Sequence, residues 1–360
     1  MAEGAASGEV LESAALGGDT AMRMGWIAAA VAAGALATAG GAAAQVQAAS
    51  GSGPPAPTHC PRACMAQVMD QYLDALVRHE PSGLPLSKGV RFTENTEEIK
   101  LGEGLWIGAT EGPTTFKVYA VDPASSQIVF YGTMKERGLP IQAAIRLKLV
   151  NGRITEIEHV LSRSISAAAA PNTITPRTAL VTDVPVAERT PRDAMVNAAD
   201  DYFEAIEHQD GSRAPFAADC DRRENGSKTT NNHPPVPWPV PLGSPEADKG
   251  MAQIGSMGCA EQLNAGVMAF ITRLWPRRID VVDEEKGLVI TFVMFNHRGG
   301  TGDLPIKGVD GVTHLPLGGG ASTMQMMEMF KIRSGQIHEV EAVGFQLPYG
   351  AKSGWEAYGQ

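Results

Sequence analysis

The sequence predicts an α+β protein made of two tandem copies of one unit, in which a helix precedes a mostly antiparallel sheet. Three pairs of matching stretches recur in the same order, and such internal repetition indicates a duplicated domain. In the first pair, 70–95 and 200–225, a tyrosine stands 22 residues before a Glu-Asn dipeptide. The second pair is 119–130 with 280–292, and the third is 151–160 (NGRITEIEHV) with 334–343 (SGQIHEVEAV).

The composition is that of a folded protein of two domains. The chain has 360 residues, of which 43% are hydrophobic and 19% charged, so a core of ordinary size is expected. The formal net charge is −10, and no run rich in Lys and Arg occurs. Nucleic acid and anionic membrane surfaces are therefore not expected as partners.

Residues 1–44 have the features of a secretory signal peptide. Arg23 precedes an apolar run over 28–39, too short to span a bilayer, and an A-x-A site follows at 42–44. We expect export to the periplasm or the medium after cleavage near Ala44; a plain Ala/Gly-rich tail is the alternative. Residues 45–59, rich in Ala, Ser, Gly and Pro, would then be a flexible leader.

Export bears on the four cysteines that follow the signal peptide. In an oxidising compartment an even number predicts disulfides, and the pairs Cys60–Cys64 and Cys220–Cys259 keep each bridge within one unit. A zinc site is the alternative, but CxxxC with two distant cysteines is a weak metal signature.

The first unit is predicted to span 60–163. Apolar residues from Val68 to Leu76 recur at helical spacing, and Glu-Pro-Ser-Gly at 80–83 ends the helix. A short strand at 90–93, an irregular turn with a buried Trp106 at 101–107, and strands at 115–121, 127–135, 141–150 and 154–161 follow. Asn151-Gly152 predicts a hairpin turn between the last two strands. Residues 164–191, rich in Ala and Pro, form either a strap across the first unit or a mobile linker.

The second unit is predicted over 192–349, with a tail at 350–360. It opens with a helix at 192–208, has a second helical pattern at 259–274, and continues with strands at 277–282, 288–297, 322–333 and 337–346. Two insertions distinguish it from the first unit, a Pro-rich one at 231–258 and a Gly-rich one at 298–323. We expect them to be lids or binding loops, or else surface elaborations.

A leading helix with a tyrosine, a curved sheet and an Ile-x-Glu hairpin near the end make each unit similar to the NTF2-like, or SnoaL-like, cone fold. RFTEN followed by LGEGLW, and CDRRENG followed by TTNN and CAEQL, resemble more closely a group of tandem NTF2-like proteins among exported bacterial and fungal sequences. The resemblance covers 60–349. It implies a pocket between the helix and the concave face of the sheet. Because the fold serves many reactions as well as plain binding, function has to come from the site.

The resemblance also suggests an acid–base site. In ketosteroid isomerase, which has this fold, a tyrosine of the first helix stabilises a developing oxyanion and a carboxylate on the next strand removes the proton. These positions match Tyr72 or Tyr202 and, within one residue, Glu94 or Glu224. A carboxylate in an apolar cavity has a raised pKa, and a phenol facing it stabilises an enolate. Alternatively, the tyrosines are core aromatics and the Glu-Asn pairs hold turns.

Further residues are predicted to support these groups. Asp221 and His297 are expected to assist Glu224, since histidine is the usual proton shuttle near neutral pH; a solvated surface position is the alternative for His297. Contacts to substrate are expected from Asn225 and Trp238 in the second unit and from Asn95 and Trp106 in the first. HxH, HxxxH, GxSxG, P-loop and dinucleotide-binding patterns do not occur, so we expect no metal and no cofactor.

Together these expectations describe a cofactor-independent lyase or isomerase for a small, largely apolar organic molecule, with the second unit favoured as the active one. A non-catalytic ligand-binding protein and a structural or interaction module are the alternatives, so enzymatic activity stays open. The two units are expected to pack sheet to sheet as an intramolecular pseudo-dimer, or the chain to form a homodimer.

Overall fold

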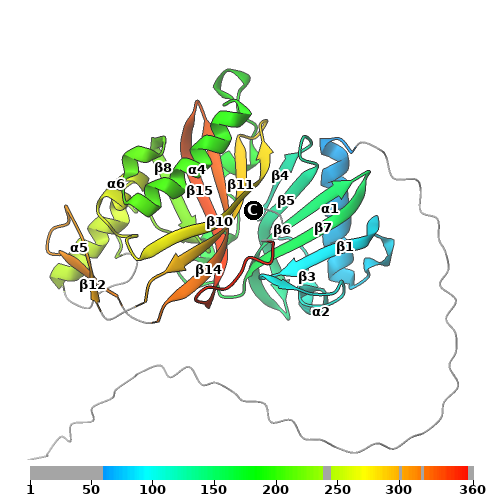
Figure 1. Cartoon of the computed structure of the whole chain (residues 1–360), viewed down its shortest axis with the longest axis horizontal. Coiled ribbons are helices and arrows are strands. Elements are labelled where there is room, and N and C mark those ends of the chain that lie inside the picture. Colours follow the sequence, from blue (N-terminus) through cyan, green and yellow to red (C-terminus); the bar gives the residue numbers. More distant parts are fainter. Residues whose placement is uncertain (1–59, 238–244, 300–301, 318–319, 356–360) are drawn as a thin grey trace, which may run out of the picture. The chain divides into compact units, whose positions relative to one another are not determined.

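The computed structural model describes residues 60–237, 245–299, 302–317 and 320–355, and it confirms the predicted α+β class: two tandem cone domains, each a helix packed on a curved sheet (Figure 1). The predicted signal peptide and leader, and Trp238, lie outside the described residues. Among the helices of these ranges, none combines the length and apolarity needed to cross a membrane.

Domain 1 begins with α1 (Arg62–Arg78), whose apolar stripe from Met65 to Leu76 is buried against the sheet. The helix ends at His79, where a left-handed backbone lets the N–H group bond to carbonyl groups of the last turn. The elements that follow are η1 (Pro81–Gly83), β1 (Leu86–Glu94), β2 (Glu97–Glu98), α2 (Leu105–Gly108), β3 (Ala109–Glu111), β4 (Lys117–Asp122), β5 (Gln127–Glu136), β6 (Leu139–Val150) and β7 (Arg153–Ser162).

Domain 2 repeats this plan. Its first helix, α4 (Arg192–His208), has the same length as α1 and also ends on a left-handed residue, Gln209. The other elements are η4 (Gly211–Arg213), β8 (Phe216–Glu224), β9 (Ser227–Lys228), α5 (Pro245–Ser256), α6 (Cys259–Asn264), β10 (Ile271–Asp283), β11 (Leu288–His297), β12 (Gly302–Pro305), β13 (His314–Leu317), β14 (Ser322–Arg333) and β15 (Gln336–Pro348).

The two main sheets have matching strand orders. They run β2-β1-β7-β6-β5-β3, with β4 also paired to β5, and β10-β11-β14-β15-β8-β9. In each sheet one parallel pair, β1 with β7 or β15 with β8, joins the strand after the first helix to the last strand, whereas the other pairs are antiparallel. This pairing places the end of β1 or β8, where the predicted Glu-Asn dipeptides lie, beside the middle of the final hairpin.

Alternation along the strands creates three apolar layers. One face of each sheet packs on its own helix, which gives a domain 1 core around Tyr72 and a domain 2 core around Tyr202. The other faces pack against each other through Phe116, Tyr131, Phe292 and Met327, among others. The predicted sheet-to-sheet packing within one chain is thus present in the described residues.

The segment between the domains lies against both sheets. It contains η2 (Ala170–Thr173), α3 (Thr178–Val181) and η3 (Val186–Glu188), and Leu180 is buried in the layer between the sheets. Arg177 donates to the backbone carbonyls of Asp221 and Val340 at 3.0 and 2.9 Å. Lys331 of β14 donates to the Thr182 carbonyl at 3.0 Å. The Thr133 hydroxyl of domain 1 donates to the Thr173 carbonyl at 2.8 Å. The segment therefore contacts both domains, whereas the strap was predicted across the first unit alone.

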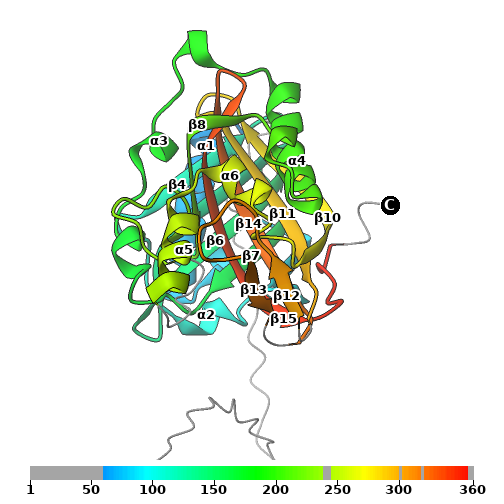
Figure 2. The ribbon, with the colours of Figure 1, turned by 90° about the vertical axis from the view of Figure 1, so that its left-hand side faces the viewer.

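The two insertions of domain 2 pack on each other. Met251 and Ile254 of α5 share a small apolar cluster with Leu304, Ile306 and Leu315, which belong to the second insertion. In Figure 2, α5 and α6 lie beside β12 and β13 on the same side of domain 2. The helix predicted at 259–274 is too long: α6 ends at Asn264, Gly266 has a left-handed backbone, and β10 begins at Ile271. Apolar spacing alone did not separate the end of this helix from the strand that follows.

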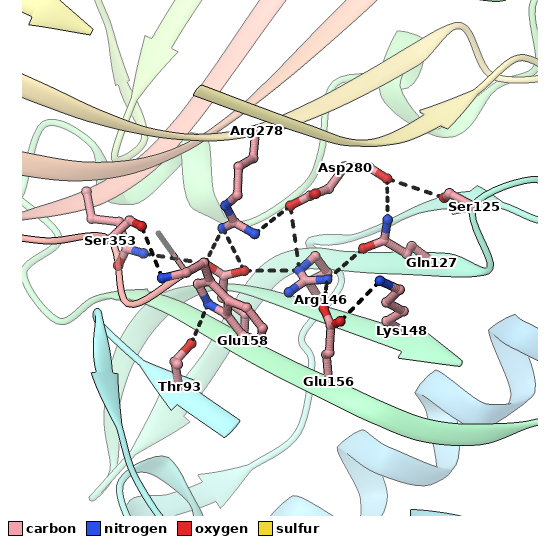
Figure 3. A network of polar contacts seen from close by, with 12 residues as sticks. Thr93, Ser125, Gln127, Arg146, Lys148, Glu156, Glu158, Arg278, Asp280 and Ser353 are labelled. Carbon is pink, nitrogen blue, oxygen red and sulfur yellow. Dashed lines mark hydrogen bonds and ion pairs between the residues drawn. The ribbon is translucent and has the colours of Figure 1, made fainter. Parts of the chain in front are cut away.

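A polar network crosses the layer between the two sheets (Figure 3). The buried carboxylate of Glu158 accepts from Arg146 at 3.0 Å within domain 1 and from Arg278 of domain 2 at 2.7 Å. The indole of Trp355, in the tail after β15, lies close to both guanidinium groups and donates to the Thr93 hydroxyl at 2.9 Å. The tail is therefore anchored on domain 1.

Candidate functional site

The interior of domain 2 holds a group of polar side chains around Tyr202. This tyrosine is 2% exposed, and its ring packs edge-on against Phe203, Phe216 and Phe330. Arg222 and Glu328 lie close enough to its hydroxyl to act on its pKa and, in turn, to be acted on by it. Burial, together with the nearby charge of Glu328, raises its pKa well above the usual value, so the phenol stays protonated and can donate.

Strand β8 carries Arg222 and Glu224 on the same face. Cys220, two residues before Arg222, is part of the domain 2 core, and alternation repeats this orientation at Arg222 and Glu224. The Glu224 side chain is 38% exposed and lies 3.6 Å from the Arg222 guanidinium. Its charge acts on both Tyr202 and Glu328. The structure therefore brings the predicted pair Tyr202 and Glu224 to one site, with Glu224 at its edge.

Asp221, the predicted assistant, points the other way. Its carboxylate accepts from the Thr230 hydroxyl at 3.1 Å and lies 3.9 Å from Arg177 of the strap. Neighbouring residues of a strand face opposite sides of the sheet, so Asp221 and Glu224 cannot share the interior of domain 2. Asp221 belongs to the layer between the sheets.

Glu328 of β14 was not predicted. Its side chain is 3% exposed and lies among apolar residues, with one carboxyl oxygen, Oε2, lacking a hydrogen-bond partner among the described residues. Burial, reinforced by the charge of Glu224, raises its pKa to about 8, although Arg222 and the Tyr202 hydroxyl act in the opposite direction. At neutral pH this carboxyl group is largely protonated and can donate a hydrogen bond.

A pattern in the sequence could have identified Glu328. It is the one charged residue within the run 322–330, STMQMMEMF, and it alternates with Met326 and Phe330, which both belong to the domain 2 core. A charged residue on the inner face of a buried strand is expensive unless it has a use. The comparison of the two repeats also singles out Glu328. When 151–160 is aligned with 334–343, the residue of domain 1 that corresponds to Glu328 is the apolar Ile145.

Arg222 is held by side chains from two other segments. Its guanidinium donates to the Thr229 hydroxyl at 3.0 Å and to the side-chain oxygen of Gln262 in α6 at 3.2 Å. Gln262 in turn donates to the Ile254 carbonyl of α5 at 2.9 Å. Although burial alone would lower the pKa of Arg222, the charge of Glu224 raises it, so the group stays cationic. Through Gln262, the inserted helices cover this side of the site.

Domain 1 has a different set of polar groups around its tyrosine. The hydroxyl of Tyr72 lies 2.8 Å from Nε2 of His159, and Nδ1 of His159 lies 3.5 Å from Glu94. Glu94 also accepts from Arg163 at 2.7 Å and from the Leu105 backbone N–H at 2.8 Å. Burial alone would raise its pKa, but His159, Arg163 and Leu105 together lower it to about 2. Glu94, predicted as a base, is therefore held in its ionised form by a network that makes it a weak one.

The asparagines predicted to contact substrate hold the turns after β1 and β8. Asn95 and Asn225 both have left-handed backbones. Asn95 exchanges two hydrogen bonds with the backbone of Leu161, at 2.8 and 3.2 Å, and Asn225 accepts from the Gly344 N–H at 3.0 Å. Their side chains are used to fix these turns to the final strand, which is the structural alternative named for the Glu-Asn pairs.

Two other predicted residues lie in apolar surroundings. Trp106 is buried in the domain 1 core, and its ring packs edge-on against that of Tyr72, with 5.4 Å between the ring centres. His297, at the end of β11, packs against Phe270, with 5.0 Å between the ring centres. Burial lowers the pKa of His297 to about 4, so it is neutral at pH 7 and acts there as a packing group.

The predicted disulfides are confirmed: Cys60 is bonded to Cys64, and Cys220 to Cys259. The second bridge joins β8, two residues before Arg222, to the first residue of α6. Elsewhere in the described ranges, no group of three or more His, Cys, Asp and Glu side chains is arranged to hold a metal ion.

Two cavities lie outside the cores around Tyr72 and Tyr202. One, of about 570 Å³, is lined by both insertions and α6, including Gln253, Glu261 and Lys307. The other, of about 440 Å³, lies between α4 and β10.

Comparison with known proteins gives two kinds of match. A family model described as a domain of unknown function (DUF8021) matches residues 188–344, which is most of domain 2. No curated protein matches the chain.

Solved structures match only in part. A “putative polyketide cyclase” from Silicibacter sp. TM1040 has 14% identity and a TM-score of 0.26, covering 42% of this chain and 90% of its own. A “putative polyketide cyclase” from Xanthomonas campestris pv. campestris has 18% identity and a TM-score of 0.25 with the same coverage. AclR, a “putative hydroxylase” from Streptomyces galilaeus, has 13% identity and a TM-score of 0.26, covering 47% of this chain and 96% of its own.

Proposed function

We propose that domain 2 is a cofactor-independent isomerase or lyase for a small, largely apolar molecule that carries a carbonyl group. The proposal rests on one observation: a carboxyl group with a pKa of about 8, Glu328, is buried beside the hydroxyl of Tyr202. A protonated carboxyl group and a phenol that converge in an apolar interior form an oxyanion hole for an enolate, the arrangement that ketosteroid isomerase uses. Arg222 adds a positive charge close to the same point.

Glu224 is the base in this mechanism. It removes the proton from the carbon next to the carbonyl group, and the electron pair moves onto the oxygen, where Tyr202 and Glu328 donate hydrogen bonds. In an isomerisation, protonated Glu224 returns the proton to another carbon. In an elimination, a group on the β-carbon leaves with the electron pair and takes the proton from Glu224. Its partial exposure at the edge of the site leaves the carboxylate accessible to substrate while it lies close to the donors.

Access to this site requires movement of its cover. Tyr202 and Glu328 are buried, and the Gln262 contacts to Arg222 and to the Ile254 carbonyl close the site from the side of α5 and α6. Loops and short helices inserted into a fold commonly act as lids of this kind. We therefore assign the two insertions of domain 2 to substrate entry.

The test uses deuterium exchange at the carbon next to the carbonyl group in a panel of cyclic ketones, followed by NMR. Glu224→Gln should slow exchange by ~10²–10⁴-fold, and Tyr202→Phe by ~10²–10³-fold. Tyr72→Phe is the matched control, because it makes the same change in domain 1 and should leave exchange unaltered. Equal exchange rates in Tyr202→Phe and Tyr72→Phe would refute the assignment of the site to domain 2.

A ligand-binding protein without turnover is the second candidate. The burial of Tyr202, Arg222 and Glu328 favours it, because polar groups that converge in an apolar interior can fix a ligand without reacting with it. Binding of substituted phenols, which mimic an enolate, separates the two. An enzyme should bind them and also exchange ketone protons, and both properties should decline in Tyr202→Phe. A binder should bind them without exchange, whereas a structural module should do neither.

We further propose that the protein is exported and belongs to the group of tandem NTF2-like proteins that its sequence resembles. The two disulfides support export, because such bonds persist in oxidising compartments. N-terminal sequencing of protein collected outside the cytoplasm should begin near Gln45. An unprocessed N-terminus on that protein would contradict the proposal.

A further inference from the structure

A large aromatic side chain lies on the surface of domain 2 beside a cavity. Trp275 of β10 is 52% exposed, whereas its neighbour Leu274 is buried in the domain 2 core. The pairing of β10 with β11 is irregular between Leu274 and Arg277, and Pro276 has no N–H group for the ladder. A bulge of this kind redirects a side chain, so the local sequence turns the indole outward.

The cavity beside Trp275 has a mixed polar lining. It measures about 440 Å³, within the range of small-ligand sites, and is bounded by α4 and the start of β10. Helix α4 contributes three carboxylates, Asp200, Glu204 and Glu207, and the strand contributes Arg273 and Arg277. Donors, acceptors and an aromatic face therefore border one cavity.

The carboxylates by themselves are explained by the fold. Arg277 lies 3.1 Å from Asp200, 2.7 Å from Glu204 and 3.0 Å from Glu207, so one guanidinium group fixes α4 to β10. These contacts do not involve Trp275, which is 52% exposed. The indole and the cavity, and not the acidic residues, are the features that the packing of the helix does not account for.

The duplication provides an internal comparison. Asp122 and Asp283 occupy matching places in the two repeats. Thr114 stands as far before Asp122 as Trp275 stands before Asp283, so Thr114 is the domain 1 counterpart of Trp275. Val77 follows Tyr72 at the same distance as Glu207 follows Tyr202, so Val77 is the domain 1 counterpart of Glu207. Trp275 and Glu207 are thus particular to domain 2, whereas Asp200 and Glu204 have acidic counterparts in Asp70 and Asp74.

The charges narrow the class of ligand. Three acidic and two basic side chains border the cavity, so neither a strong anion nor a strong cation is favoured. The Arg273 guanidinium lies 5.9 Å from the Trp275 ring centre and so already supplies a cation to the indole. A neutral ligand with an apolar face and many hydroxyl groups fits best: the face would stack on the indole, and the hydroxyl groups would bond to carboxylates and guanidinium groups.

We propose that the cavity between α4 and β10 is a binding site for a neutral saccharide, with Trp275 as its stacking platform. The site is separate from the group around Tyr202, because the cavity lies on the outer side of α4 whereas Tyr202 faces the core. Saccharide binding and acid–base chemistry in domain 2 can therefore be tested independently.

Isothermal titration with cellobiose, maltose and N,N′-diacetylchitobiose tests the proposal on the mature chain. At least one disaccharide should bind, and Trp275→Ala should weaken its binding by about tenfold, the effect of losing one stacked aromatic contact. Trp275→Phe should recover part of this loss. Tyr349→Ala is the matched control, because Tyr349 is also exposed but does not line the cavity, and it should bind as the wild type does.

Three results would overturn the proposal. They are no binding of any of the three disaccharides to the wild type, equal binding by Trp275→Ala and Tyr349→Ala, and preferential binding of spermidine or tetraethylammonium at the same site. Because Trp275 lies outside the domain core, all variants should keep the wild-type unfolding midpoint, so a loss of binding would not reflect a loss of fold.

Discussion

At the scale of single residues, Glu328 connects the candidate site to the stability of domain 2. Its pKa in the folded protein is about 8, above the ordinary value for an unfolded glutamate. The folded state therefore binds a proton that the unfolded state has lost over the range between these two values. The contribution of Glu328 to the free energy of unfolding is fully present below about pH 4 and is lost as the pH rises through about 8.

We therefore predict that stability falls between about pH 5 and pH 8 in the wild type by a few kcal/mol more than in Glu328→Gln. Glutamine keeps the shape and a donor but does not titrate. Urea unfolding at several pH values measures the difference. Glu80→Gln, at an exposed position, should preserve the wild-type slope, and a wild-type slope in Glu328→Gln would show that the carboxyl group is not protonated in the fold.

Glu94 should show the opposite dependence. Its pKa in the fold is about 2, so its contribution to stability is present above the unfolded value and is lost as the pH falls toward 2. Glu94→Gln should cost on the order of 2 kcal/mol near neutral pH, because Arg163 loses its ionic partner, and the cost should shrink as acid protonates the wild-type carboxylate. Urea titrations of both proteins at neutral and acidic pH give the comparison. A pH-independent cost would contradict the assigned pKa.

At the scale of elements, the disulfides offer a test of what each bridge contributes. Cys220–Cys259 closes a loop of 39 residues between β8 and α6, whereas Cys60–Cys64 spans four. In the chain-entropy model, removing the long bridge costs about 4 kcal/mol and removing the short one about 2. Denaturant unfolding of Cys220→Ala/Cys259→Ala and Cys60→Ala/Cys64→Ala compares them. Equal losses would mean that local packing, not loop closure, sets the contribution.

The sequence predicted most elements but could not predict how the site is assembled. Helices α1 and α4 and the final hairpins have strong periodicity, so their places follow from the pattern alone. Tyr202 and Glu224 were also found, because the duplication marks them. The orientation of Asp221 was missed, since the start of β8 alternates too briefly to fix its register without its partner strand. Glu328 was missed because its raised pKa depends on residues from α4, β8 and β14 that only the fold brings together.

At the scale of the whole molecule, the two domains exchange equivalent ion pairs. Arg62, at the start of α1, binds Asp283 of domain 2 at 2.8 and 2.5 Å. Arg192, at the start of α4, binds Asp122 of domain 1 at 3.1 and 2.5 Å. Each aspartate also accepts from a backbone N–H of the opposite domain, Asp283 from Val121 at 2.9 Å and Asp122 from Val282 at 3.0 Å. This reciprocal exchange is the contact pattern of a two-fold symmetric dimer, here within one chain.

The exchange predicts that the domains unfold together. Asp122→Ala leaves the Arg192 guanidinium and the Val282 N–H without their partner, which should cost on the order of 3 kcal/mol. Hydrogen exchange measured by mass spectrometry on peptides from β6 and β14 reports the two domains separately. Asp122 belongs to domain 1 and its partners to domain 2. If these contacts couple the domains, Asp122→Ala should lower protection equally in both peptides. Asp74→Ala, on the exposed face of α1, should change neither. Loss of protection confined to β6 would mean that Asp122 stabilises only its own domain, and that the apolar layer between the sheets does not transmit the change.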